Sequence, residues 1–294
     1  MRVHHLNCGC MCPVGGAWFD GFSKGLTASL VCHCLLIETD HHGLVLVDTG
    51  FGTCDVATPR KRLSPFFILF NNIRFERRYT ALEQVRQLGF APEDVRHIVL
   101  THLDFDHAGG LEDFPQAKVH VLQREMDAAR STRSFIGRNR YREKQWDEVR
   151  NWQFYQPGGD TWFGFQAVRE MVGLPPEILL IPLTGHTRGH AGVALQTDEG
   201  WLLHAGDAYF YRDEVGQIDR HCTPGLAFYQ RMMEVDRSSR LANQHRLWML
   251  SVEHKGEVSL FCSHDAKELE RMRAGNPPAR AAATETAAAG QMPQ

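Results

Sequence analysis

The sequence lacks any long hydrophobic run. Its longest apolar stretches, PFFILF (65–70) and ASLVCHCLLI (28–37), are far too short to cross a bilayer, which takes about 20 residues. The first ten residues, MRVHHLNCGC, also lack the charged-then-apolar pattern of a secretory signal. We therefore expect a soluble, cytoplasmic protein with no membrane partner.

Charge of either sign is not in excess. The 32 Lys and Arg residues against 35 Asp and Glu residues give a formal net charge of −3, and no long basic run is present. This balance argues against a nucleic-acid partner. The chain has 294 residues, of which 43% are hydrophobic. It is therefore long enough to bury one large core.

Three common cofactor and metal patterns are missing. The eight cysteines include no C-x-x-C pair, the spacing typical of structural zinc sites. Five of them lie in the first 34 residues, and we expect these to be half-buried strand residues in a reducing compartment. Neither a P-loop nor a G-x-G-x-x-G fingerprint is present, so no nucleotide cofactor is indicated.

The sequence does contain short apolar runs that alternate with helical patterns. The runs predict strands at 95–100, 117–122, 177–183, 192–197, 200–206 and 257–262, and a pair within 31–50 joined by a turn at 40–43. Helices are predicted at 80–90, 124–130, 141–152, 227–246 and 266–274. Because strands and helices alternate in both halves, we expect a layered α/β domain.

We expect this single domain to span residues 1–274. Residues 59–79 form a basic-then-aromatic insertion, PRKRLSPFFILFNNIRFERRY. Residues 275–294 are biased toward Ala and Pro and lack large apolar side chains, so we expect a disordered tail there.

One short stretch concentrates ligand-type side chains. THLDFDHAGG (101–110) holds His102, Asp104, Asp106 and His107 directly after a predicted strand. Packing explains such a cluster poorly, because neighbouring ionisable groups repel one another unless a cation offsets them. Similar residues follow other predicted strands: His186 and His190 in TGHTRGH, Asp207 after WLLHAG, and His264 in SHD. Strand ends meet at one edge of a sheet, and imidazole with carboxylate suits zinc, iron or manganese.

The order of these motifs resembles the metallo-β-lactamase fold superfamily of metal-dependent hydrolases. The match spans about residues 28–265 and begins with LVLVDTG. Four motifs follow in order: H-x-D-x-D-H-A-G-G, G-H-T-x-G-H, A-G-D-A and S-H-D. FPQAKVHVLQREMDAA and the hydrophobic insertion look most similar to the N-acyl homoserine lactonase branch. The resemblance implies a four-layer αββα sandwich, with two mixed sheets flanked by helices.

The resemblance also implies a binuclear metal centre. Its implied ligands are His102, Asp104 and His186 for the first metal, Asp106, His107 and His264 for the second, and Asp207 between them. Asp48 and His190 would orient these ligands from outside. The implied cofactors are two divalent ions, with zinc first and iron or manganese as alternatives.

Position 104 departs from the family, where most members have a histidine that binds through Nδ1. An aspartate oxygen lies the same number of bonds from Cα as that nitrogen, and a flavodiiron branch has Glu here, so Asp104 can serve as a ligand. A carboxylate shifts the preference toward iron or manganese. The alternative is that Asp104 only hydrogen-bonds His102 or a loop amide, which leaves the first metal weakly held.

The implied reaction is hydrolysis of an ester-like or lactone carbonyl by a metal-bridging hydroxide, since bound metal brings the pKa of water down to about 7. Asp106 is expected to orient the nucleophile and move its proton. Lactonases of this fold use a tyrosine shortly after the bridging aspartate, but that spacing falls here on Phe210. We expect the neighbouring Tyr209 to take the catalytic role and Tyr211 to line the pocket.

The insertion and the reaction class leave alternatives open. Phe66, Phe67 and Phe70 would form a lid or wall for the acyl chain of a small-molecule substrate, or a packed helix or homodimer contact. The rival activities are a non-heme iron redox or oxygen-chemistry enzyme on the same fold, and a phosphoester or thioester hydrolase. A binding protein with a decayed site is the third class.

Overall fold

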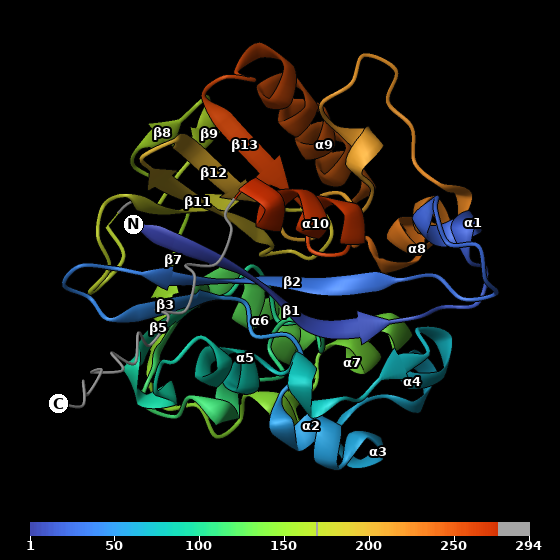
Figure 1. Ribbon diagram of the computed structural model, residues 1–294, viewed down its shortest axis with the longest axis horizontal. Coiled ribbons are helices and arrows are strands. Elements are labelled where there is room, and N and C mark those ends of the chain that lie inside the picture. The colour runs from blue at the N-terminus through green and yellow to red at the C-terminus, as the bar shows by residue number, and fades with distance from the viewer. Residues whose placement is uncertain (169, 276–294) are drawn as a thin grey trace, which may run out of the picture.

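Two β-sheets pack face to face at the centre of the structure, and helices cover both outer faces (Figure 1). The computed structural model describes residues 1–168 and 170–275, and the predicted tail lies outside them apart from Gly275. The strands are β1 (Arg2–Met11), β2 (Leu30–Glu38), β3 (Leu44–Val47), β4 (Ile73–Arg74), β5 (Val95–Val99), β6 (Lys118–Leu122), β7 (Trp152–Tyr155), β8 (Thr161–Trp162), β9 (Phe165–Gln166), β10 (Ile178–Pro182), β11 (Ala191–Thr197), β12 (Gly200–His204) and β13 (Val258–Phe261).

Both large sheets are mixed. The first has the order β4-β1-β2-β3-β5-β6-β7, and the second has the order β10-β11-β12-β13. Strands β3, β5, β6 and β7 run parallel, and so do β12 and β13. Strands β8 and β9 form a separate small hairpin. Because several parallel strands end at the same edge, the loops that follow them are brought together there.

The burial pattern of the strands explains the layers. In β2, Leu35 and Ile37 enter the apolar cluster between the two sheets, while Leu36 enters the cluster on the other face with α5 (Ala81–Gln87) and α6 (Gln123–Ser131). This alternation follows from the two-residue period of a strand. Leu247 of α9 (Arg237–Glu253) packs on the outer face of the second sheet. The predicted four-layer αββα sandwich is confirmed.

The predicted strands are all present, but three features differ from the expectations. The helix predicted at 227–246 is instead two helices, α8 (Pro224–Met233) and α9, separated by residues 234–236. The ten-residue strand β1 was not predicted, although it pairs with β2 along most of its length. Residues 141–152 are not a helix: only a 3-10 turn at Glu143–Gln145 forms. The buried amide of Gln145 donates there to Asp55 Oδ2 and to the Phe105 carbonyl, so tertiary contacts override the helical pattern.

The insertion at 59–79 is ordered and lies beside the motif loop. It contains α3 (Pro59–Arg62), α4 (Pro65–Phe70) and β4. The Phe67 ring stacks on Phe105 of the motif loop at a centroid distance of 4.8 Å. Phe66 contacts Phe135 of α7 (Phe135–Arg140) edge-on. The insertion therefore braces both the motif loop and α7.

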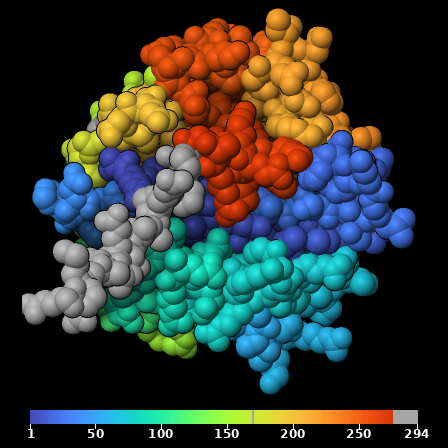
Figure 2. Space-filling view, in the orientation of Figure 1, coloured from blue at the N-terminus to red at the C-terminus, as the bar shows by residue number. Residues whose placement is uncertain are grey.

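The remaining helices are α1 (Ala17–Asp20), α2 (Thr53–Ala57), α8 (Pro224–Met233) and α10 (Ala266–Gly275). Helix α10 packs across the N-terminal strands, and Figure 2 shows its red atoms directly above the blue ones. Arg273 Nε donates to the His5 carbonyl at 2.8 Å. Among the described residues, no helix is long and apolar enough to cross a membrane.

Candidate metal centre

Four loops at one edge of the sandwich bring the motif residues together. They follow β5, β10, β12 and β13, the strands that precede THLDFDH, TGHTRGH, AGD and SHD. Two groups of donor atoms each lie within 4.8 Å of one another: His102, His186 and Asp207, and His107, Asp207 and His264. We call the space beside His102, Asp104 and His186 the first position, and the space beside Asp106, His107 and His264 the second position.

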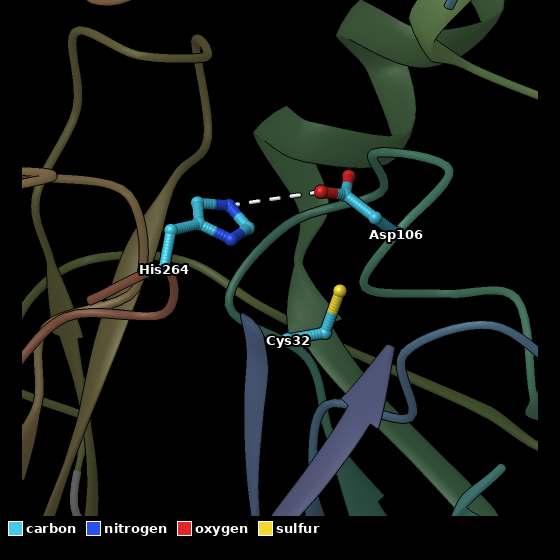
Figure 3. Close-up of side chains that lie close together, drawn as sticks. All are labelled: Cys32, Asp106 and His264. Carbon is cyan, nitrogen blue, oxygen red and sulfur yellow. Dashed lines mark ion pairs between the residues drawn. The ribbon is translucent and has the colours of Figure 1, made fainter. Parts of the chain in front are cut away.

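At the second position, the ring nitrogens face carboxylate oxygens. His264 Nε2 lies 3.2 Å from Asp207 Oδ2 and 3.6 Å from Asp106 Oδ2. His107 Nε2 lies 3.4 Å from Asp207 Oδ1. Figure 3 shows His264 and Asp106 pointing toward each other across this space. Asp207 therefore contacts both histidines of the second position.

The opposite edge of each ring fixes which nitrogen carries a proton. His264 Nδ1 donates to the Val31 carbonyl at 2.7 Å, and His107 Nδ1 donates to Asp48 Oδ2 at 2.8 Å. In a neutral ring, each Nε2 then directs a lone pair at the carboxylates. Imidazole nitrogens and carboxylate oxygens that face one another in a buried site are stabilised by a proton or a metal cation between them.

Buried atoms without hydrogen-bond partners mark the same space. Among the described residues, His107 Nε2 and Asp207 Oδ1 have none, and His102 Nε2 of the first position has none either. Burial opposes ionisation of Asp207, but His264 and His107 hold the pKa of this carboxyl well below its usual range. An ionised carboxylate with a free oxygen beside two imidazole lone pairs is the donor set that a divalent cation takes. The residues at the second position therefore fit a metal.

The first position has similar donors but a different neighbour. His186 Nε2 lies 3.2 Å from Asp104 Oδ2 and 3.3 Å from Asp207 Oδ2, and His102 Nε2 lies 3.3 Å from Asp104 Oδ2. Arg140, which is buried, reaches into this group from the end of α7. Its Nε donates to Asp104 Oδ1 at 2.6 Å, and its Nη2 donates to Asp104 Oδ2.

Arg140 also engages a histidine of the first position. Its Nη2 lies 2.6 Å from His186 Nε2, which must accept because a guanidinium only donates. Burial disfavours the charge on Asp104, but Arg140 and then His102 hold its pKa well below its usual range. The sequence analysis missed Arg140. The signal for it is Asp104 itself, since a buried carboxylate in place of a neutral histidine needs a cation.

The two predicted orienting residues, Asp48 and His190, contact donor residues or the loops that carry them. Asp48 accepts from His107 and from Thr101 Oγ1 at 2.7 Å, and Thr101 Oγ1 in turn lies 2.9 Å from His102 Nδ1. His190 Nε2 accepts from the backbone N–H of Asp207 at 2.8 Å, while its Nδ1 donates to the Leu183 carbonyl. Both residues hold the donor-bearing loops in place.

Comparison with known proteins identifies the family. The sequence profile of the Metallo-beta-lactamase superfamily matches residues 29–245. The chain belongs to the metallo-β-lactamase superfamily. A probable metallo-hydrolase of Mycobacterium tuberculosis is 39% identical over 273 residues, which cover 90% of this chain and 80% of the relative. An N-acyl homoserine lactonase of Bacillus cereus is 28% identical over 239 residues, covering 76% and 86%.

Solved structures show the same fold. An N-acyl homoserine lactone hydrolase with N-hexanoyl-L-homoserine bound at its catalytic metal centre aligns with a TM-score of 0.66 at 20% identity, covering 92% of this chain and 95% of its own. A dizinc quorum-quenching lactonase, AidC, aligns with a TM-score of 0.59 at 17% identity, covering 89% and 86%. The predicted membership of this metallo-hydrolase superfamily is confirmed.

The aromatic residues after Asp207 do not lie where the sequence analysis expected. The Tyr209 hydroxyl donates to Glu268, 3.1 Å away, inside the apolar cluster under the second sheet. This placement argues against its predicted catalytic role. Tyr211 accepts from Arg212 Nη2 at 3.0 Å, so its hydroxyl is also engaged away from the donor atoms. Phe210, between them, stacks on His264 at a ring distance of 5.1 Å.

A different phenol lies beside Phe210. Tyr229 of α8 packs edge-on against Phe210, and its hydroxyl lies 3.3 Å from Asn71 Nδ2, which donates to it. Burial raises the pKa of Tyr229 well above its usual range, and Asp106 adds to that effect. Phe70 of the insertion stacks on the same ring at 5.9 Å. Phe70, one of the predicted pocket residues, thus contacts this phenol.

Cys32 of β2 adjoins the second position. Its sulfur, one Asp106 oxygen and one His264 nitrogen lie within 4.8 Å of one another. In Figure 3 the sulfur points toward the space between these two side chains. Burial, with Asp106 next, raises the pKa of the Cys32 thiol well above its usual range. Sequence analysis placed Cys32 only among half-buried strand cysteines, whereas the structure buries it against Asp106.

Proposed function

We propose that this protein is a metal-dependent hydrolase that acts on an ester-like or lactone carbonyl. The observation that carries the proposal is that the Nε2 atoms of His107 and His264 face the carboxylates of Asp106 and Asp207, while both Nδ1 atoms are hydrogen-bonded elsewhere. These four residues would hold the metal. A divalent cation bound there supplies Lewis acidity and lowers the pKa of a coordinated water toward neutrality.

Asp106 is the residue we assign to proton transfer. It is buried, and burial raises its pKa above the usual range, with His107 and His264 opposing that effect. Its carboxylate lies beside His264, whereas the Asp104 carboxylate accepts two hydrogen bonds from the guanidinium of Arg140. A carboxyl group placed next to the attacking water orients it and accepts its proton.

The approach to the centre favours attack at the second position. Asp106 retains 5% exposure and Asp207 retains 3%, whereas His102 and His186 are 0% exposed. Asp106 is thus the most exposed of the donor residues, and we assign it to the side from which substrate approaches. Phe210, Phe70 and Tyr229 form an apolar wall there with one hydroxyl, which suits an acyl chain that ends in a carbonyl. We assign Tyr229 the contact to the carbonyl oxygen that lactonases of this fold take from a tyrosine at the position of Phe210.

The structure gives no support to the alternative of a non-heme iron redox enzyme. A carboxylate ligand at position 104 was the argument for iron chemistry, but both oxygens of Asp104 accept from Arg140. The likeness to a Bacillus cereus N-acyl homoserine lactonase over 76% of the chain instead supports a lactone as the first substrate to test.

A panel of metal-loaded assays tests the proposal. Zinc-, manganese- and iron-loaded protein would be assayed with a chromogenic ester, an N-acyl homoserine lactone, a thioester and a phosphoester. We expect hydrolysis of the ester or the lactone, which Asp106→Asn abolishes. Hydrolysis of the phosphoester alone would move the protein to another branch of the superfamily, and oxygen consumption without hydrolysis would reject the proposal.

A further inference from the structure

The charge and donors of Arg140 set the first position apart. All five of its N–H bonds are used: Nε and one Nη2 bond go to Asp104, and the other Nη2 bond goes to His186 Nε2. The two Nη1 bonds go to the Met233 carbonyl at 2.6 Å and the His186 carbonyl at 3.3 Å. Arg140 is 1% exposed. No N–H remains for a substrate, so Arg140 is a fixed structural cation.

This cation removes donors from the first position. Asp104 has both oxygens in a two-pronged pair with the guanidinium, a geometry that planar arginine and carboxylate groups favour. His186 Nε2, the nitrogen that faces the centre, accepts from the same guanidinium. His102 Nε2 and Asp207 Oδ2 are left, and Asp207 is shared with the second position. These two donors, which do not contact the guanidinium, fall short of the three protein ligands that even an open metal site uses. The Asp104 oxygens keep further lone pairs, but their charge is already neutralised by Arg140.

Charge leads to the same conclusion. A divalent ion beside His186 would lie next to a guanidinium that cannot lose its proton or act as a ligand. At the second position, the neighbouring groups are carboxylates and imidazole lone pairs. The first position therefore does not fit a metal ion, although the fold family implies one there.

We infer that Arg140 takes the place of the first metal as the counter-charge of Asp104, so that each chain binds one divalent ion, at the second position. The arginine and the aspartate act as a pair: the guanidinium neutralises Asp104, and Asp104 orients the guanidinium onto His186. Arg140 is thus a positioning residue that fixes the His186 loop. The inference rests on the proposed metal binding but not on the proposed substrate.

Cobalt titration measures the number of metals directly. Metal-free wild-type protein would be titrated with cobalt(II) chloride, followed by visible absorption, and the count checked by elemental analysis of protein purified without added metal. We expect saturation at about one equivalent. Saturation at two equivalents with similar affinity would overturn the inference. A protein that binds one cobalt but hydrolyses no lactone would fail only the proposed function.

A double substitution tests whether Arg140 is the cause. Asp104→His with Arg140→Gln removes the cation and restores the neutral ligand common in the family, so we expect saturation at two equivalents. The matched control is Arg138→Gln, an exposed arginine of the same helix, which should stay at one. A folded double variant that still binds one cobalt would contradict the role of Arg140. Arg140→Lys keeps the positive charge, so we expect this variant also to bind one equivalent of cobalt. Binding of a second cobalt ion by this variant would contradict positive charge as the cause.

Discussion

The first and second positions use the same residue types and share Asp207 and the loop after β5, yet their donors have different partners. At the first position, Asp104 and His186 contact the guanidinium of Arg140. At the second position, His107 Nε2 and Asp207 Oδ1 have no hydrogen-bond partner among the described residues. We infer from this difference that a ligand motif alone does not determine which position binds a metal. The groups behind the ligands decide whether a lone pair is available.

The strongest test of the second position is Asp106→Asn. The amide keeps the size of the side chain but removes the charge that we assign to metal binding and proton transfer. We expect kcat/KM to fall by about 10³-fold, with loss of bound metal by elemental analysis. His254→Ala is the control, because His254 is a surface residue that contacts Glu257. Full metal content and activity in Asp106→Asn would place the reaction elsewhere.

At the first position, we expect substitution of Arg140 to lower the stability of the fold. Arg140→Gln leaves the Asp104 carboxylate buried and unpaired, so we expect the metal-free protein to lose about 3–5 kcal/mol in free energy of unfolding. Adding Asp104→Asn should recover most of that loss. Urea denaturation in excess chelator measures both variants. Arg237→Gln, in an exposed pair with Glu234, should cost less than about 1 kcal/mol. An equally small cost for Arg140→Gln would contradict a structural cation.

A buried carboxyl outside both positions provides a pH test. Burial raises the pKa of Glu268 from 4.5 to about 7, and its oxygens accept from Tyr209 and the Cys262 amide. A carboxyl with a raised folded-state pKa stabilises the fold below pH 4.5 and loses that contribution as the pH rises through 7. The shift corresponds to about 3 kcal/mol.

Glu268→Gln should remove that pH dependence. We expect the variant to gain stability over wild type at pH 8 and to show little advantage at pH 4, measured by urea denaturation at both values. Glu270→Gln, an exposed position on the same helix, should follow the wild-type curve. A Gln variant that parallels wild type at every pH would show that Glu268 does not titrate in this range.

The smallest effect is expected at the phenol beside the centre. Tyr229→Phe removes one hydroxyl and keeps the ring that packs on Phe210. We expect kcat/KM for a lactone or ester to fall about tenfold, the value of one hydrogen bond to the reacting group. Tyr211→Phe should leave activity unchanged. Equal losses in both variants would indicate a packing effect and reject the contact assigned to Tyr229.

Much of the centre could be predicted because its residues follow strand ends. Asp106, Asp207 and His264 lie far apart in the sequence, but the loops that carry them leave strands at one edge of the sandwich. Arg140 could not be predicted in this way, because it ends a short helix in a segment with several other arginines. The same holds for Glu125, whose carboxylate accepts from the Leu103 and Gly189 amides and ties two of the loops together. Long-range contacts set the roles of both residues.

A crystal structure with anomalous scattering data collected at the edge of the bound metal tests the central claim most directly. The account predicts one anomalous peak per chain, within bonding distance of Asp106, His107 and His264, and intact contacts from Arg140 to Asp104 and His186. A second peak of similar height between His102 and His186, with Arg140 displaced from Asp104, would contradict it.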